Sequence, residues 1–130
     1  RGAFTLSIAD VKHLKEADFF GIASGNNMPD KFERSGLTVT KSDKVDAPIV
    51  NEFPLTLECK VVEAKNEVYG FHVLGEIVGG VVDESVLDEK RIVDVSKLGA
   101  FAFDQFGGNY FAIGEKVGKA WEAGKALMNK

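Results

Sequence analysis

The residues of this 130-residue sequence whose types could do chemistry are two histidines, one cysteine and a run of aromatic rings. His13 and His72 stand far apart in the sequence, and neither has ligand-spaced neighbours, so no metal site is predicted. His72 and Glu76 share a strand face but would lie roughly 13 Å apart, too far to share a metal ion. Cys59 falls on the apolar face of a predicted strand. It is therefore predicted to pack as a small hydrophobe, with a reactive thiol as the alternative.

The aromatic run covers residues 101–111 and is the most suggestive stretch of the chain. Its five rings could form one edge of the core, which the residues alone favour, or could line a slot for a planar ligand. No phosphate-binding loop of the Gly-x-Gly-x-x-Gly or Walker type occurs anywhere. No set of catalytic side chains is found, which is compatible with an enzyme whose cofactor carries the chemistry.

The first half of the chain is predicted to form two helices and several strands, which would position these groups. Ser7 is predicted to cap a helix that runs to Ile22, and Gly36 to end a shorter helix over 29–34. Strands are predicted over 37–40 and 55–63, with a loop over 41–54 between them. In the second strand, alternation predicts an apolar face and a solvent-facing one. The solvent-facing residues are Thr56, Glu58 and Lys60.

The second half begins with a turn at 65–67 and a long strand over 68–82. Gly75 and Gly79 in that strand indicate bends or bulges, as a barrel requires. A loop with short helical turns follows over 83–98. Two extended pieces, 100–103 and 110–113, flank a turn at 107–109, and a last helix is predicted over about 115–128. These elements predict a small β-barrel or an α+β fold.

Composition places the chain among ordinary globular proteins, as one domain over residues 1–130. It is 45% hydrophobic and 28% charged, with a net charge of −4. Such a balance argues against nucleic-acid binding, and no apolar run is long enough to span a membrane. No secretory signal is visible, and a lone cysteine fits a cytoplasmic protein. The chain starts at Arg1 in what reads as the tail of a strand, so a fragment of a longer protein is expected.

An ordered set of short stretches resembles the flavoredoxin-type flavin reductases, which are FMN-binding split-barrel proteins. The resemblance covers nearly the whole chain, and the order of the stretches is more specific than any one of them. The matching stretches are 16–25 (EADFFGIASG), 30–32 (DKF), 36–38 (GLT), 46–49 (DAPI), 54–60 (PLTLECK), 75–78 (GEIV), 83–88 (DESVLD), 110–111 (YF), 114–118 (GEKVG) and Trp121.

The resemblance implies a mostly β fold with helices, a split β-barrel of Greek-key type whose N-terminal strands this chain lacks. It also implies FMN at a homodimer interface, reduced by NAD(P)H. By analogy, Phe103, Asp104 and Tyr110 approach the flavin, and no side chain is assigned as catalytic. Gly70 stands where many relatives carry a histidine, so no nicotinamide role is carried over to His72.

Two other functions remain open at this point. The chain could be an FMN-binding electron carrier without reductase activity of its own, which the absence of an acid–base set would suit. It could also be a non-enzymatic β-barrel interaction module, which the expected loss of the first strands would suit.

Overall fold

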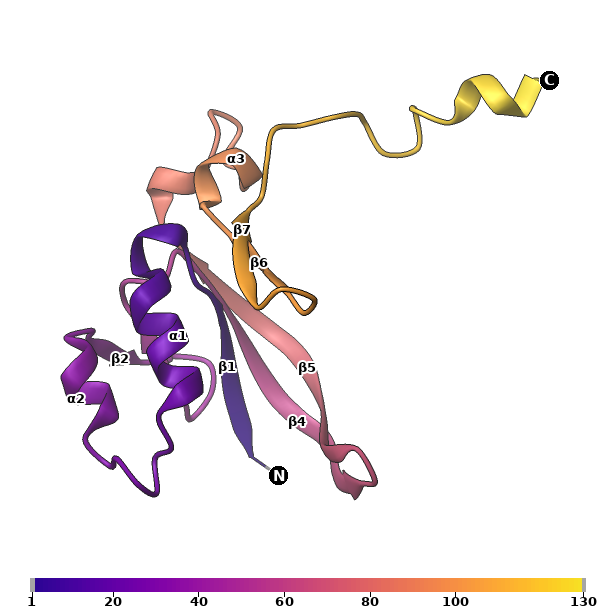
Figure 1. Ribbon diagram of the computed structural model, residues 1–130. Coiled ribbons are helices and arrows are strands. Elements are labelled where there is room, and N and C mark those ends of the chain that lie inside the picture. Colours follow the sequence, from indigo (N-terminus) through magenta and orange to yellow (C-terminus); the bar gives the residue numbers. More distant parts are fainter. Residues whose placement is uncertain (1, 130) are drawn as a thin grey trace.

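A computed structural model describes residues 2–129 and shows mostly β-structure with short helices (Figure 1). The central sheet is antiparallel, in the order β1-β4-β5, and consists of β1 (Ala3–Ile8), β4 (Leu55–Glu67) and β5 (Gly70–Val82). Two further pairs are β2 (Val39–Lys41) with β3 (Pro48–Val50), and β6 (Phe101–Asp104) with β7 (Asn109–Ala112). The strands among residues 2–129 thus form three open sheets, and the central one does not close on itself.

The segment around Ser7 is a strand, so the predicted helix start at that residue is wrong. Ser7 pairs with Thr56 across β1 and β4, and their hydroxyl oxygens are hydrogen-bonded at 2.9 Å. Helical structure begins later, with η1 (Val11–His13) and α1 (Leu14–Ile22). Pairing of six consecutive residues with β4 outweighs a local capping signal, since cross-strand contacts are the main source of strand stability.

Both predicted N-terminal helices are present and pack against each other, and the second begins at Lys31, two residues later than predicted. Helix α2 spans Lys31–Ser35, and Gly36 ends it in a left-handed conformation (φ 77°). Lys31 Nζ donates hydrogen bonds to the carbonyl oxygens of Phe20 and Ala23, at 3.0 and 2.8 Å. Lysine therefore satisfies free carbonyls at the end of α1, where the helix dipole also favours a positive charge.

The face of β4 predicted to meet solvent is instead the most buried part of the sheet. Thr56 and Glu58 are only 1% and 2% exposed. The β2–β3 pair covers this face, and Ser42, in the loop between β2 and β3, donates a hydrogen bond to Glu58 Oε2 at 2.5 Å. Residues 41–54, predicted as a loop, thus contain β3 and form a cover for the sheet. Cys59 on the other face is buried, in agreement with its predicted packing role.

Strands β4 and β5 form a long hairpin whose turn lies at residues 68–69, not at 65–67. The register shifts between Glu58 and Cys59 and again between Val61 and Glu63. Gly79 and Gly75 pair with Glu58 and Val61, so each glycine faces one of the two shifts, as the sequence indicates. Beyond β5, the loop contains η2 (Glu84–Val86) and α3 (Val95–Leu98), which confirms its predicted short helical turns.

The helix predicted over 115–128 is absent. Residues 113–119 have no regular secondary structure, and a short 3-10 helix, η3 (Lys125–Asn129), follows after a turn. Gly118 and Gly124 weaken this segment as a helix, by roughly 1 kcal/mol each. An amphipathic helix of this kind needs a surface to pack on, and here the apolar stripe is fully exposed.

Glu52 holds the β2–β3 pair together, and we predict that its contribution to the stability of the fold depends on pH. Its carboxylate accepts hydrogen bonds from the backbone N–H and the hydroxyl of Thr38, at 3.0 and 2.8 Å. These bonds, the backbone one first, hold the pKa of Glu52 below its ordinary value of 4.5. A carboxyl with a lowered folded pKa stabilises the fold at pH values above 4.5, and that stabilisation is lost as the pH falls through the folded pKa.

We therefore expect Glu52→Gln to reduce the loss of stability between about pH 5 and pH 3, measured by urea unfolding at each pH. Glu89→Gln, at an exposed position, is the matched control and should follow the unmodified protein. Identical pH profiles for Glu52→Gln and the unmodified protein would contradict the assignment.

Candidate functional site

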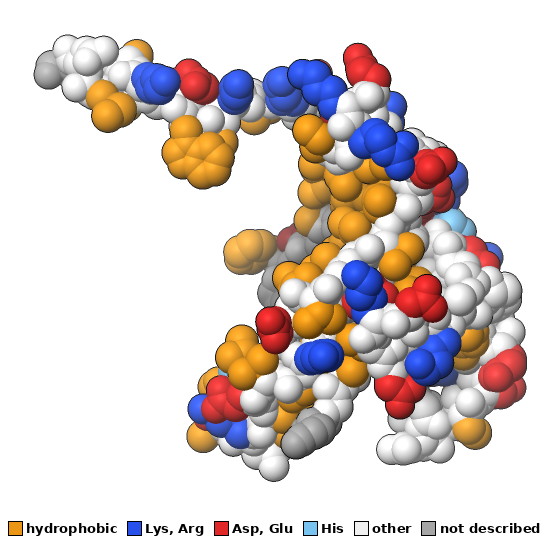
Figure 2. Space-filling view, turned by 180° about the vertical axis from the view of Figure 1, so that it is seen from behind, with side chains coloured by type: hydrophobic (Ala, Val, Ile, Leu, Met, Phe, Trp, Pro, Cys, Tyr) orange, Lys and Arg blue, Asp and Glu red, His pale blue; other side chains and the backbone are white. Residues whose placement is uncertain are grey.

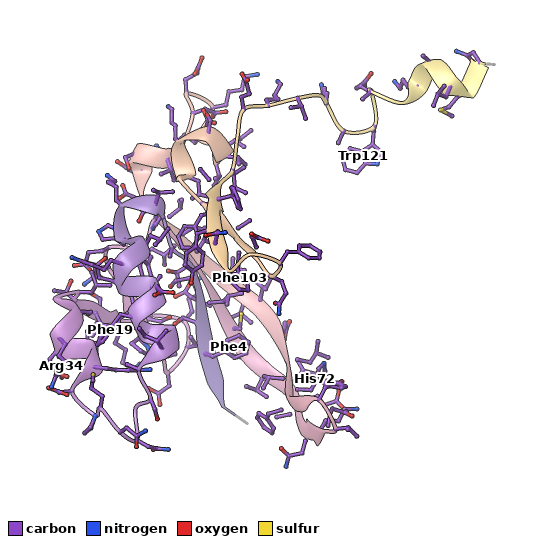
Figure 3. The ribbon with its side chains drawn as sticks, in the orientation of Figure 1. Phe4, Phe19, Arg34, His72, Phe103 and Trp121 are labelled. Atoms are coloured by element: carbon purple, nitrogen blue, oxygen red, sulfur yellow. The ribbon has the colours of Figure 1, made fainter. Side chains whose placement is uncertain are left out.

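The β6–β7 hairpin brings two of the three predicted site residues into contact. Phe103 and Tyr110 are cross-strand partners whose ring centroids lie 5.8 Å apart. Phe101 meets Tyr110 edge-to-face at 5.3 Å, which completes a cluster of three rings. Phe103 remains 58% exposed and lies on the hairpin as labelled in Figure 3. The hairpin therefore presents an exposed cluster of tilted aromatic rings, and the Phe103 ring in it can contact a planar ligand ring.

Asp104, the third predicted residue, holds the turn of this hairpin. Its carboxylate accepts hydrogen bonds from the backbone N–H groups of Phe106 and Gly107, at 2.9 and 3.2 Å. Gly108 is in a left-handed conformation (φ 74°), and its N–H donates to the Asp104 carbonyl at 2.9 Å. Asp104 is thus engaged in an Asx turn that fixes where the two strands, and hence Phe103 and Tyr110, stand.

Tyr110 also connects the hairpin to helix α1. Its hydroxyl donates a hydrogen bond of 2.6 Å to Asp18 Oδ1. This bond to a carboxylate raises the pKa of Tyr110 above its ordinary value of 10. The phenol therefore stays protonated near neutral pH and acts as a donor. Asp18 was not predicted as a site residue, since nothing in the sequence pairs two positions separated by 92 residues.

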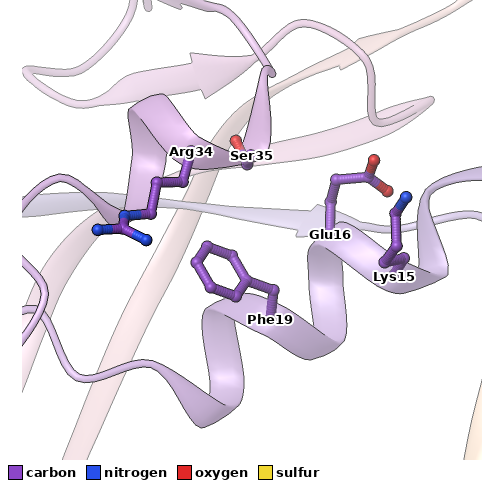
Figure 4. Close-up of a pocket in the computed structure, with 5 residues that line it drawn as sticks. All are labelled: Lys15, Glu16, Phe19, Arg34 and Ser35. Carbon is purple, nitrogen blue, oxygen red and sulfur yellow. The ribbon is translucent and has the colours of Figure 1, made fainter.

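A hollow of about 290 Å³ lies between α1 and α2, away from the hairpin, with the Phe19 ring in its wall (Figure 4). Lys15, Glu16, Arg34 and Ser35 complete its lining. Arg34 Nε is already bound to Asp30 at 3.0 Å, and the carboxylate of Glu16 offsets the charge of Lys15. The hollow has little net positive charge to attract a phosphate, so we place the candidate site on the β6–β7 hairpin.

Of the two histidines, His13 is held by its neighbours, whereas Nδ1 of His72 is buried without a hydrogen-bond partner among the described residues. His13 Nδ1 is 2.6 Å from Asp10 Oδ1, and its ring meets Phe53 edge-on. His72 lies on β5, near the tip of the β4–β5 hairpin (Figure 3). Within residues 2–129, no three His, Cys, Asp or Glu side chains gather closely enough to hold a metal ion. Over the same range, no helix has the length and apolar character required to cross a membrane.

Comparison with known proteins finds a family model and several solved structures that match this chain. The family described as flavin reductase like domain matches residues 1–108. The flavoredoxin of Desulfovibrio vulgaris (Miyazaki F) is 40% identical with a TM-score of 0.86, over 95% of this chain and 66% of that one. The flavoredoxin from Methanosarcina acetivorans is 26% identical with a TM-score of 0.88, over 98% of this chain and 66% of that one.

A curated relative from Aquifex aeolicus (strain VF5), an uncharacterized protein, is 33% identical over 100 residues, which are 72% of this chain and 50% of the relative. The chain therefore spans about half the length of this curated relative and about two thirds of each flavoredoxin structure. A family match over residues 1–108, together with the shared fold, identifies the chain as a member of the flavin reductase-like domain family.

Proposed function

We propose that this chain is part of an FMN-dependent flavin reductase that uses NAD(P)H to reduce bound flavin and passes the electrons on. The observation that carries the proposal is the exposed Phe103 ring beside Tyr110, on a hairpin fixed to α1, in a chain of this family. A rigidly held aromatic surface suits a protein whose task is to bind and orient a flat cofactor.

The described residues suit the ring of FMN better than its phosphate. The exposed Phe103 ring offers aromatic contact beside Tyr110, and the Tyr110 hydroxyl keeps the pair in place through Asp18. FMN, when bound, would supply the ability to accept a hydride from a nicotinamide and to release electrons singly or in pairs. The protein's own part is to hold the ring and to limit access of water to it.

We further propose that the chain is one domain over residues 1–130 of a split β-barrel of Greek-key type, and that it acts as a homodimer. Strands β1 and β5 are the two edges of the central sheet, and each pairs on one side only among residues 2–129. Exposed sheet edges favour pairing with additional strands. Strands from the rest of a longer protein would extend the sheet toward a barrel.

An FMN-binding electron carrier is the second candidate. The acidic and phenolic groups at the hairpin are committed to structure, since Asp18 holds Tyr110 and Asp104 holds the turn. A site that only stores and passes electrons would need no further proton-transferring group. Rapid reduction of bound FMN by NADH or NADPH alone would reject this candidate. Reduction that requires a partner protein would support it over the reductase.

Flavin titration of this chain tests both candidates against a non-enzymatic interaction module. We expect quenching of FMN fluorescence with a micromolar Kd. Replacement of Phe103 by Ala should weaken binding about tenfold, since an aromatic stacking partner contributes about 1–3 kcal/mol. Phe106→Ala is the matched control, because Phe106 lies fully exposed in the turn of the same hairpin. It should leave the Kd unchanged.

Two results would contradict these expectations. An FMN Kd beyond about 1 mM, which corresponds to only about 4 kcal/mol of binding, would leave the interaction module as the better description. Equal losses for Phe103→Ala and Phe106→Ala would move the flavin site away from the exposed Phe103 ring.

A further inference from the structure

Asp18 on helix α1 brings a negative charge to the aromatic cluster of the β6–β7 hairpin. Its Oδ1 atom accepts the hydrogen bond of 2.6 Å from the Tyr110 hydroxyl, and the Tyr110 ring lies 5.8 Å from the Phe103 ring, centroid to centroid. One phenol ring therefore separates the carboxylate from the exposed Phe103 ring. Figure 2 shows hydrophobic side chains gathered below the extended C-terminal segment, on the part of the surface that carries this hairpin. The charge of Asp18 thus stands beside an apolar surface.

No cation among residues 2–129 forms an ion pair with this carboxylate. The ion pairs in that range all involve other acidic side chains. Lys15, three residues earlier on α1, lines the hollow between α1 and α2 and is not paired with Asp18. The partner of Asp18 is the neutral phenol of Tyr110, which donates a hydrogen bond but adds no positive charge. A ring that stacks on Phe103 therefore meets a local field that is negative.

Two contacts fix the position of this charge relative to the hairpin. Close to the start of β6, the backbone N–H of Val11 donates to the carbonyl oxygen of Gly99 at 2.8 Å. A Cβ atom at Gly99 would stand 3.3 Å from Asp10 Cβ, so glycine permits this close approach. The bond between Tyr110 and Asp18 is the second contact. The carboxylate is therefore in place before a ligand binds, and its effect on a bound ring requires no rearrangement.

A flavin ring changes its charge when it is reduced. The oxidised ring is neutral, and when it accepts a hydride, which carries two electrons and one proton, it becomes an anion. A fixed negative charge nearby repels the anion and has little effect on the neutral ring. The position of Asp18 should therefore separate the affinities of the site for the two forms of the ring.

We propose that the carboxylate of Asp18 makes the hairpin site hold the oxidised flavin ring more tightly than the reduced, anionic ring. By linkage, Asp18 also lowers the reduction potential of the bound ring, which suits a protein that passes its electrons on. The inference rests on the proposed flavin site. If the chain binds neither form of FMN, both proposals are wrong. If it binds both forms and their relative affinity does not depend on Asp18, only this inference is wrong.

The ratio of the Kd for reduced FMN to the Kd for oxidised FMN measures this preference. Anaerobic titrations at about pH 8, where Asp18 is ionised, give both constants, and the contribution of the FMN phosphate cancels in their ratio. Asp18→Asn removes the charge but keeps an oxygen that can accept the Tyr110 hydrogen bond. It should lower the ratio at least about fivefold, the effect of unit charges as far as about 16 Å apart at an effective dielectric constant of about 20. An unchanged ratio would overturn the proposal.

Two other variants and a second pH separate the effect of charge from that of position. Glu16→Gln removes a half-buried carboxylate from the same helix, but two residues along a helix reach its opposite side, where Glu16 lines the hollow. It should leave the ratio unchanged. Tyr110→Phe keeps the charge of Asp18 and should change both Kd values by the same factor. At about pH 5.5 the reduced ring is neutral while Asp18 stays ionised, so the effect of Asp18→Asn should disappear. An equal effect at both pH values, or from Glu16→Gln, would contradict the charge mechanism.

Titration of Tyr110 tests the position of the charge without any flavin. The chain has two tyrosines, and Tyr69→Phe, at a position that is 79% exposed, leaves Tyr110 as the only one. The hydrogen bond to Asp18 raises the pKa of Tyr110 above its ordinary value of 10, and the absorbance of the phenolate reports this pKa. Asp18→Asn should lower the pKa of Tyr110 toward 10. An ordinary pKa of Tyr110 in the Tyr69→Phe chain would show that the carboxylate does not stand beside the hairpin, and would overturn the proposal.

Discussion

Replacement of Ser42 by Ala should lower the free energy of unfolding by about 2 kcal/mol, because it removes the hydrogen bond to a buried carboxylate. Ser42 Oγ donates to Glu58 Oε2 at 2.5 Å, and Glu58 is almost completely buried. The same oxygen accepts the backbone N–H groups of Lys44 and Val45, at 3.0 and 3.1 Å. One hydroxyl therefore both shapes the β2–β3 loop and attaches that loop to the central sheet.

Ser24 provides the control for this substitution. Its hydroxyl also accepts a backbone N–H, that of Asn26 at 3.1 Å, but it is exposed and donates to no carboxylate. Ser24→Ala should cost less than about 0.5 kcal/mol, as is usual at exposed positions. Urea unfolding measures both values. Equal effects of the two substitutions would show that the turn, and not the buried Glu58 contact, determines the role of Ser42.

Replacement of Gly75 by Ala should destabilise the chain by about 1–3 kcal/mol, the usual cost of forcing extra atoms into packed space. A Cβ atom at Gly75 would stand 2.6 Å from Phe4 Cζ and 3.3 Å from Cys59 Cβ. The Phe4 ring would have to leave its place on the sheet.

Gly80→Ala is the matched control on the same strand, because a Cβ atom there would meet its nearest neighbour, the Thr56 carbonyl oxygen, at an ordinary 3.6 Å. A double-mutant cycle locates the cause of the Gly75 effect. In a Phe4→Ala background the ring is gone, so Gly75→Ala should cost much less than in the unmodified chain. Additive effects of the two substitutions would contradict a direct clash between the Gly75 position and Phe4.

The β6–β7 hairpin carries the residues that the family resemblance assigns to the flavin site. Phe103 and Tyr110 were predicted to share a site, and they are in contact because the turn residues between them place the two strands in register. The contribution of Asp18 could not be predicted, because it depends on helix α1 approaching a hairpin far along the chain. The orientation of the candidate site is therefore a tertiary property, although most of its rings belong to one short stretch.

Features that depend on neighbouring residues could be predicted from the sequence. Gly36 ends α2, a turn over 105–108, predicted at 107–109, joins β6 to β7, and Gly75 and Gly79 face the register shifts of the long hairpin. These features follow from the backbone conformations that glycine and turn residues permit, which act over a few bonds. The ordered set of short stretches likewise indicated the family before any fold was known.

Which surfaces are covered depends on how distant segments pack together, and the sequence pattern does not show this. Ser7 has a good capping pattern but pairs with β4, and Thr56 and Glu58 alternate like solvent-facing residues but lie beneath the β2–β3 pair. The apolar stripe at 115–128 has the spacing of a packed helix but meets no surface of its own chain. Burial depends on segments that are distant in sequence, and hydrophobic periodicity reports that a face can be buried without specifying what buries it.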